Sequence, residues 1–212
     1  MVHERLREIP VRFYRTTAGV EPVLEWLHRL DKGDRHAIGL DLMRVQFGWP
    51  IGMPLMRSLK SGLWEVRSTL PSQKIARLIV CFHQNNLIVL HGFIKKPKRT
   101  PREDIDLAMR RKAGGYSVKK KKTHIGSSLN DFLKEEGILE EARATALKEA
   151  LAWQVQNAMK KEKINKVEMA RRMKTSRAAL DRLLDPGYSS VTLQTLCKAA
   201  RAVGRDLRIE LV

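Results

Sequence analysis

AGGYSVKKKKTHIG, residues 113–126, divides the chain into two parts of different character. Two adjacent glycines stand near its start, four consecutive lysines follow, and its apolar residues have no helical or strand period. A glycine pair ends a helix and a run of lysines is too charged to enter a core, so the segment is typical of a solvated linker. We therefore predict two modules, residues 1–115 and 125–212, joined by a basic linker at 116–124.

The two parts also differ in charge. Residues 1–122 contain 25 Lys and Arg against 11 Asp and Glu, whereas residues 123–212 contain 16 against 12. The whole chain has a formal net charge of +18 on a globular background. Such a charge favours a polyanionic partner, nucleic acid before membrane. The alternative is a basic protein that is merely soluble.

Several classes of protein are disfavoured by the sequence. No apolar run approaches the roughly 20 residues of a membrane-spanning helix, and the charged N-terminus does not resemble a signal peptide. Cys81 and Cys197 lie in different modules, which argues against a disulfide framework and for a reducing cytoplasm. No spacing of Cys and His suggests a metal site, so we expect no metal and no other cofactor.

The first module begins with one strand and two helices. Residues 9–15 are β-rich and alternate, which predicts a strand. Residues 21–30 and 34–47 each place apolar side chains on one stripe, which predicts two helices. Glycines and prolines at residues 48–54 then break the chain into a loop.

Three more strands and a helix should complete this module. The strands are predicted at residues 63–69, 75–82 and 87–94, and the short connections between them favour an antiparallel meander. The asparagine pair at residues 85–86 suits the positive φ of a tight hairpin turn. Thr, Pro and Glu within residues 100–103 form a capping signal that should begin the helix.

An arginine interrupts the apolar strand IARLIVCF. Arg77 is costly to bury without a partner. A turn with an odd number of residues would place Arg67 opposite Arg77 on one face, where two cations repel unless an anion lies between them. The alternative is that Arg77 forms a structural ion pair with Glu65. Basic side chains follow the last of the three strands and would make a rim around the sheet: Lys95, Lys96, Lys98 and Arg99.

LWEVR, IARLIVCF and IVLHGFIKKPKRTPREDIDLAMRR together resemble the HigB-type toxins of phage-related origin, in the RelE/ParE superfamily, over roughly residues 10–112. The resemblance implies a RelE-like domain with helices packed on an antiparallel sheet. It also implies metal-free cleavage of mRNA at the ribosome. Such cleavage needs a nucleophilic 2′-oxygen, a stabilised pentavalent phosphate and a protonated leaving 5′-oxygen. Fixed cations can stabilise the phosphate, and a lysine of depressed pKa or a histidine can move the protons.

The resemblance implies site residues by position. The implied catalytic residues are Arg77, Arg67, Lys95, Lys96 and His91, and the implied RNA contacts are Lys98 and Arg99. Arg77 matches the superfamily's strand arginine, and Arg67 the basic residue one strand earlier. His91 is the histidine of this group, although a strand histidine is more often structural than catalytic. The C-terminal tyrosine that some relatives use is missing, which leaves the acid and base unassigned.

The second module is helical in pattern almost throughout. Residues 127–137 have a serine cap and a final glycine, as a short helix would, and residues 138–161 predict a long helix. Residues 192–203 predict a later core helix. Residues 207–212 alternate as a terminal strand, which would need to pair with its copy in a homodimer.

Residues 166–187, KVEMARRMKTSRAALDRLLDPG, have the pattern of a helix-turn-helix. Ala170 is small where the two helices cross, and Ser176 would cap the second helix. Lys174 stands where the turn usually has glycine, so it must either adopt a left-handed conformation, at a cost of about 1 kcal/mol, or use another turn. The pattern resembles the XRE/Cro class and HigA-type antitoxins; the alternative is a generic helix pair.

This second resemblance implies a DNA interface. The start of the second helix would face base edges, where Arg177 and Arg182 suit guanine. The implied DNA contacts are Lys166, Lys174, Ser176, Arg177, Ala178, Asp181 and Arg182. Of these, the lysines and the serine suit phosphates.

An acidic segment lies between the linker and this motif. Its acids are Asp131, Glu135, Glu136, Glu140 and Glu141. The surrounding sequence, THIGSSLNDFLKEEGILEEA, also resembles the HigA-type antitoxins. We expect this segment and the long helix after it to dock on the basic sheet of the first module and to cover or distort the Arg67/Arg77 site, held there by Leu129, Phe132 and Leu133.

The sequence thus predicts an α+β protein containing a toxin–antitoxin pair. A ribosome-dependent mRNA interferase module would be neutralised by a DNA-binding antitoxin module that also represses transcription. Tethering gives an effective concentration of about millimolar, so the intact chain should have little ribonuclease activity. The expected partners are mRNA on the ribosome, operator DNA, and the other module, in the same chain or across a dimer. The alternative is a DNA-binding repressor whose toxin-like module is catalytically dead and serves oligomerisation.

Overall fold

The computed structural model describes residues 8–49, 51–95, 101–115, 124–185, 188 and 190–207. The chain divides into two compact units, Met1–Arg143 (unit 1) and Ala144–Val212 (unit 2). Some expectations fall outside the described residues: Lys96, Lys98, Arg99, the cap at Thr100, residues 116–123 of the linker and all but the first residue of the terminal strand.

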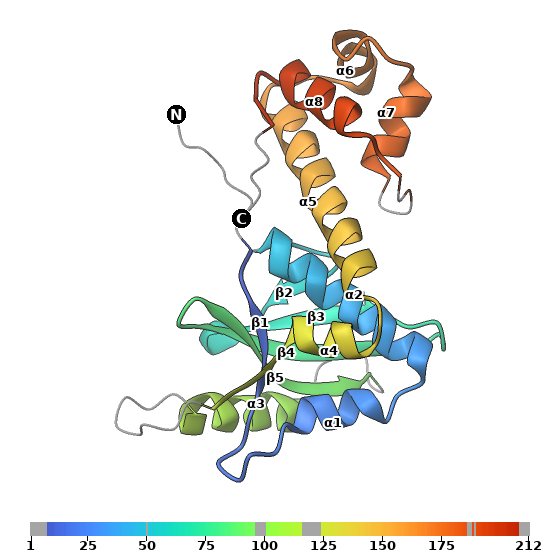
Figure 1. Cartoon of the computed structure of the whole chain (residues 1–212). Coiled ribbons are helices and arrows are strands. Elements are labelled where there is room, and N and C mark those ends of the chain that lie inside the picture. Colours follow the sequence, from blue (N-terminus) through green and yellow to red (C-terminus); the bar gives the residue numbers. More distant parts are fainter. Residues whose placement is uncertain are drawn as a thin grey trace. The chain divides into compact units, whose positions relative to one another are not determined.

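Unit 1 is built on a six-stranded sheet in the order β2-β3-β4-β5-β1-β6 (Figure 1). The strands are β1 (Val11–Tyr14), β2 (Met56–Ser58), β3 (Leu63–Thr69), β4 (Ile75–His83), β5 (Asn86–Ile94) and β6 (Ile125–Ser128). Because β1 pairs with β5 in parallel while the other pairs are antiparallel, the sheet is mixed. The expectation of an antiparallel sheet is therefore correct for the β3–β5 meander and wrong for β1, whose return through two helices allows parallel pairing.

The turn between β4 and β5 lies within the predicted connection, residues 83–86, but its positive-φ residues begin one residue before the asparagine pair. His83 pairs with Asn86, which leaves a two-residue turn at Gln84 and Asn85 with φ of 44° and 62°. Positive φ at both central residues is the requirement of a type I′ hairpin turn. The asparagine pair thus marks the hairpin, although Asn86 already belongs to the strand.

Four helices pack on this sheet: α1 (Pro22–His28), α2 (Lys32–Gly48), α3 (Arg102–Gly115) and α4 (Leu129–Glu135). A short 3-10 turn, η1 (Lys60–Gly62), precedes β3. Alternation along β1 separates the two faces, because Phe13 and Tyr14 point in opposite directions. Phe13 meets α4, whereas Tyr14 belongs to a core cluster with Ala108 of α3. Helices α1, α2 and α4 therefore cover one face and α3 covers the other.

Helix α4 is part of the core of unit 1. Ser128 forms the predicted cap, accepting a hydrogen bond from the amide of Asp131 at 3.0 Å. Leu129, Phe132 and Leu133 are buried, as expected for the residues that hold this segment. The Phe132 ring meets the Phe13 ring edge to face, with centroids 6.0 Å apart.

A glycine on α2 makes room for this helix. A Cβ placed on Gly39 would lie 2.6 Å from Cδ2 of Leu133 and 3.6 Å from the ring of Phe132. In Figure 1, α4 lies beside α2, and contacts between the two helices confirm this. Unit 1 thus extends well past residue 115, and the division into a toxin and an antitoxin module stays a prediction.

Strand β6 is fastened by Glu21, which precedes α1. The Glu21 carboxylate accepts hydrogen bonds from the Ser127 amide at 3.0 Å and from the Ser127 hydroxyl at 3.1 Å. The same carboxylate also accepts from Nη2 of Arg15 at 2.7 Å. A Cβ on Gly126 would lie 2.5 Å from the carboxyl carbon of Glu21, so this approach requires glycine.

Unit 2 consists of helices. Helix α5 (Leu139–Lys161) begins in unit 1, and α6 (Lys166–Arg172), α7 (Arg177–Leu184) and α8 (Leu193–Ala202) follow it. The side chains of Asn165, Ser176 and Thr192 cap the last three helices, and the cap at Ser176 is the one that the helix-turn-helix pattern predicts. Lys174 has a φ of 50°, so the chain takes the left-handed alternative in the turn before α7. None of the described helices has the length and apolarity that a membrane span needs.

Phe132→Ala should lower the free energy of unfolding of unit 1 by about 3–5 kcal/mol, because it leaves a cavity against Phe13. The measurement is urea unfolding followed by fluorescence in a Trp153→Phe background. The other three tryptophans all lie in unit 1, so the signal reports on that unit.

Phe82→Ala is the matched control, since Phe82 lies in the same unit but is 46% exposed. It should cost much less than Phe132→Ala. Equal losses for the two variants would show that α4 is not part of the core.

Candidate functional site

The two strand arginines lie directly opposite each other, as the odd-numbered turn predicts. Arg67 on β3 and Arg77 on β4 are register partners. The anion between them belongs to the chain itself. Oε1 of Glu65 lies 3.1 Å from Nη1 of Arg77, and Oε2 lies 2.7 Å from Nε of Arg67. The predicted alternative, an ion pair between Arg77 and Glu65, is thus confirmed.

A third arginine joins this cluster from the edge strand. Arg57 on β2 is the register partner of Glu65, and its Nη2 lies 3.5 Å from Oε2 of that residue. The Glu65 side chain is 0% exposed, Arg77 is 5% exposed, Arg67 24% and Arg57 46%. The cluster therefore runs from a buried carboxylate outward to two accessible guanidinium groups. Its four side chains carry a net charge of +2.

Sequence reasoning did not find Arg57 and treated Glu65 only as a partner of Arg77. Strand β2 is three residues long, which is too short to show alternation. The signal for Glu65 was present in LWEVR, where Glu65 and Arg67 are two residues apart on a strand and so share a face.

His91 is held by α3 rather than directed into the arginine cluster. Its Nε2 lies 2.8 Å from Oδ1 of Asp104, and its ring stacks on Phe93 with centroids 5.5 Å apart. This geometry fits the structural role that is usual for a strand histidine, and a role in proton transfer stays a prediction. Lys95 continues the ladder beyond β5, since its amide donates to the Ile75 carbonyl at 2.7 Å.

The arginine cluster and α4 lie on opposite faces of the sheet. Glu65 is the register partner of Ile79, which packs with Ala108 of α3, whereas Phe132 of α4 packs on Phe13 across the sheet. The expectation that this helix covers or distorts the Arg67/Arg77 site is wrong. The apolar side chains of α4 pack over β1 and against α2, on the other face of the sheet.

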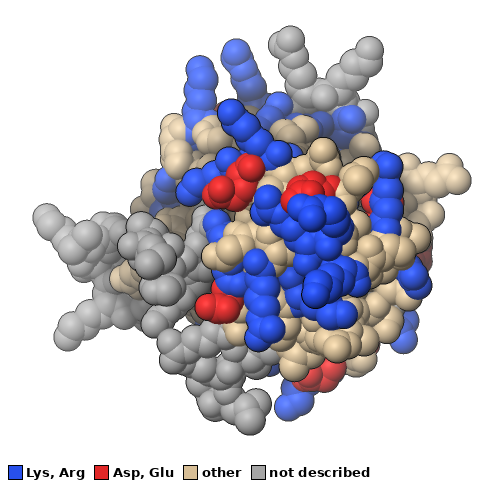
Figure 2. All heavy atoms as spheres, turned by 90° about the horizontal axis from the view of Figure 1, so that it is seen from above, with Lys and Arg blue, Asp and Glu red and all other residues tan. Residues whose placement is uncertain are grey.

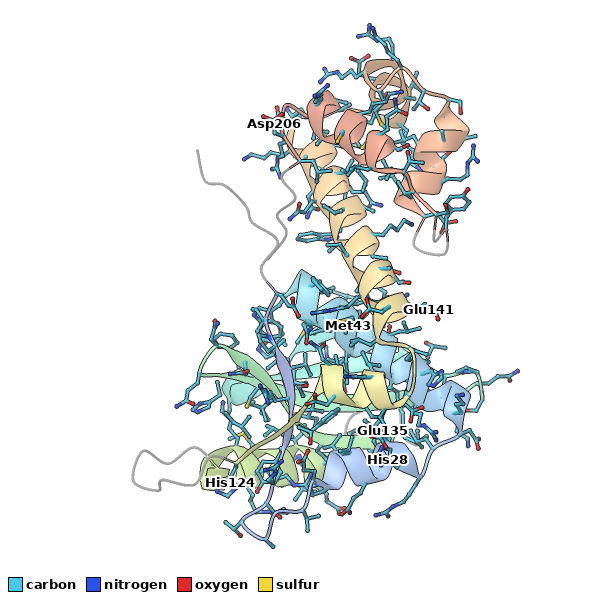
Figure 3. All side chains as sticks on the ribbon, in the orientation of Figure 1. His28, Met43, His124, Glu135, Glu141 and Asp206 are labelled. Atoms are coloured by element: carbon cyan, nitrogen blue, oxygen red, sulfur yellow. The ribbon has the colours of Figure 1, made fainter. Side chains whose placement is uncertain are left out.

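The acidic side chains of this segment act locally. Oε2 of Glu136 lies 2.8 Å from Nε of Arg35 and 2.9 Å from Nε2 of His36, both on α2. Burial alone would raise the pKa of Glu136, but the hydrogen bonds from these two residues hold it below its ordinary value. Figure 3 shows Glu135 beside His28 of α1, where Oε2 of Glu135 lies 3.9 Å from Nε2 of His28. Glu135 and Glu136 thus connect the C-terminal end of α4 to α1 and α2.

In unit 2, the predicted DNA contacts gather around α7. Nζ of Lys166 lies 2.6 Å from Oδ1 of Asp181, and Nε of Arg177 lies 3.9 Å from Oδ2. The hydrogen bond from Lys166 lowers the pKa of Asp181. Arg182 lies over the Tyr188 ring, 5.8 Å from its centroid.

The remaining candidates stand at the start of the same helix. Ser176 uses its hydroxyl for the cap, while Lys174 and Ala178 are exposed. Unit 2 contains 14 Lys and Arg against 7 Asp and Glu. Figure 2 views the molecule from the side of α6, α7 and α8 and shows Lys and Arg over much of that face.

The three arginines and Glu65 lie inside a segment that is similar to a known family. Residues 25–113 match the model of the family described as phage derived protein Gp49-like (DUF891). This segment is thus similar to the Gp49-like family. The family belongs to the RelE/HigB toxin-like superfamily, so the resemblance to that superfamily is confirmed for this part of unit 1.

The family match ends at residue 113. A search of the curated proteins and a search of the solved structures gave no match. The resemblance of the second module to HigA-type antitoxins therefore stays a prediction. Within the described ranges, no group of three or more His, Cys, Asp and Glu could hold a metal ion.

The three arginines should differ in their contribution to stability. Arg77→Ala removes a partner from a buried carboxylate and should cost about 3–5 kcal/mol. Arg57→Ala removes a half-exposed partner and should cost about 1 kcal/mol or less, with Arg67→Ala between the two. Urea unfolding of the three variants measures this order. A fully stable Arg77→Ala protein would contradict the buried ion pair.

Proposed function

We propose that this chain is a toxin–antitoxin pair in one polypeptide. In this proposal unit 1 cleaves mRNA on the ribosome and unit 2 binds operator DNA. The observation that carries the proposal is the net charge of +2 around Glu65, with Arg57 and Arg67 accessible, inside the segment that matches a toxin-like family. A concentrated positive charge on one face of a sheet is suited to a phosphodiester.

The proposed chemistry uses fixed cations rather than a metal. Attack of a 2′-oxygen on the adjacent phosphorus places additional negative charge on the phosphoryl oxygens. Arg67 and Arg57 would stabilise that charge through guanidinium N–H donors whose positions are set before the reaction begins. Arg77 is 5% exposed, so in this account it holds Glu65 and does not contact the phosphate.

The proton transfers fall to the residues beside the cluster. His91, hydrogen-bonded to Asp104, and Lys95 are the described candidates on this side of the sheet. A histidine titrates near neutral pH and can act as either acid or base. This assignment is a proposal that extends the family resemblance.

Unit 2 is proposed to bind DNA through the exposed side of α7. Its basic surface supplies attraction to phosphates that does not depend on sequence, and Arg177 and Arg182 would supply base contacts. The short connection between α6 and α7, with Lys174 in the left-handed conformation, supports a helix-turn-helix. An antitoxin role, a cytoplasmic location and a homodimer are parts of the same proposal.

Because α4 packs on the face of the sheet opposite the arginines, neutralisation would not come from filling this site with residues 129–135. We propose that unit 2 instead hinders the entry of unit 1 into the ribosome. The competing function is a repressor whose toxin-like unit binds RNA or protein without cleavage. Translation arrest separates the two functions.

The fragment to test is the compact unit Met1–Arg143, because a fragment ending at residue 115 would lack β6 and α4. Once circular dichroism shows that it is folded, it should cleave mRNA and arrest cell-free translation more strongly than the full chain. Arg67→Ala should slow cleavage by about 10²–10³-fold, as expected for the loss of one donor to the transition state.

Arg29→Ala is the control, since Arg29 is 76% exposed on the opposite side of unit 1 and its guanidinium forms an ion pair with the exposed Glu25. It should retain full activity. A folded fragment as inactive as its Arg67→Ala variant would favour the repressor.

DNA binding should divide the basic residues of unit 2 into two groups. Arg182→Ala should lose about 1–3 kcal/mol of discrimination at one base pair, while Lys174→Ala should weaken binding to all sequences alike. Titrations of the full chain against a series of operator variants measure both effects. If Arg182→Ala weakens every operator equally, α7 does not read bases.

A further inference from the structure

The feature that organises the arginine cluster is the carboxylate of Glu65. Its side chain is 0% exposed, and both of its oxygens are engaged: Oε1 by Arg77, and Oε2 by Arg67 and Arg57. A buried carboxylate is stable only where cations and hydrogen bonds replace the water that it has lost. Glu65 therefore depends on the arginines.

The arginines depend equally on Glu65. They come from three adjacent strands, and two of them, Arg67 and Arg77, are direct cross-strand partners. Like charges directly opposite on a sheet repel each other, and arginine cannot lose its proton to relieve that repulsion. The Glu65 carboxylate lies on the same face and contacts all three arginines, so its negative charge offsets their repulsion.

The contacts also fix the direction of the accessible groups. Arg67 donates its Nε–H to Glu65 at 2.7 Å, which constrains the plane of its guanidinium, while its Nη1 lies 3.8 Å from Sδ of the exposed Met53. Arg57 meets the same oxygen through Nη2. A guanidinium has five N–H donors, so each arginine keeps donors for a ligand after binding the carboxylate.

We infer that Glu65 is the positioning residue of a phosphodiester site, one that orients Arg57 and Arg67 without contacting the substrate. The inference rests on the proposed function in one respect only, namely that the ligand is RNA. If the inference is correct, RNA binding requires Glu65, although the negative charge of Glu65 repels the RNA phosphate.

Two explanations of Glu65 predict opposite results. If it only neutralises charge, Glu65→Gln raises the net charge of the cluster from +2 to +3, and an RNA phosphate binds more tightly. If it positions the arginines, the same substitution frees Arg67 to rotate, and binding weakens despite the added charge. Glu65→Asp retains the charge and withdraws the carboxylate by one methylene, so only positioning predicts weaker binding.

The experiment is an NMR titration of the full chain with a short single-stranded RNA whose 2′-oxygens are methylated, which blocks cleavage. The Nε–Hε signal of Arg67 reports on this site separately from any RNA bound by unit 2. In the wild type this signal should be sharp and should shift on titration. In Glu65→Gln and Glu65→Asp it should broaden, and the affinity measured from shifts in unit 1 should fall about tenfold, the equivalent of one charged hydrogen bond.

Glu25→Gln is the matched control, since it removes an exposed carboxylate that pairs with Arg29 at 3.6 Å. It should change neither signal nor affinity. Unchanged or tighter binding by Glu65→Gln or Glu65→Asp overturns the inference, and Glu65→Asp decides it if the glutamine variant does not fold. If the wild type binds no RNA at this site, the proposed function fails, while an Arg67 signal that stays sharp in the variants would still refute positioning.

Discussion

The packing of Phe132 and Leu133 of α4 into unit 1 is the contact on which the rest of the fold depends. Burial of each of these side chains contributes about 1.5–3 kcal/mol, and the absence of a side chain at Gly39 lets the helix approach α2. With α4 in place, the preceding residues lie along β1 as β6, fastened by Glu21. One face of the sheet then carries α1, α2 and α4, and the arginine cluster lies on the other.

This arrangement separates the roles of apolar and charged residues. The chain places its most acidic segment beside its most basic part, and charge alone would bring that segment to the arginines. In the structure, apolar burial selects the surface, and the acidic side chains then pair with whatever cations border it, such as Arg35 and His36. The arginines are left with Glu65, an anion from their own sheet. Long-range charge complementarity thus gave the correct partner, unit 1, and the wrong face.

Local patterns allowed much of unit 1 to be predicted. Alternation located β3, β4 and β5, and of the turn lengths left open the odd one, which places Arg67 opposite Arg77, is found. In unit 2, capping residues located α6 and α7, and steric reasoning at Lys174 left two turn conformations, of which the left-handed one is found. What could not be predicted involves pairing between distant segments. Strands β2 and β6 are three and four residues long, and each forms only by pairing with a neighbouring strand, β3 or β1. Because Arg57 lies on β2, its place in the site could not be predicted from the sequence either.

The central claim is that residues 124–143 are an integral part of unit 1 and not a detachable segment. Native-state hydrogen exchange of the full chain tests it most directly, because it compares the opening of α4 with the opening of the sheet. The account predicts that the amide of Leu133 exchanges with the same opening free energy as amides of β4, such as that of Val80. An amide of Leu133 that exchanges through a separate opening of much lower free energy, while β4 stays protected, would contradict it.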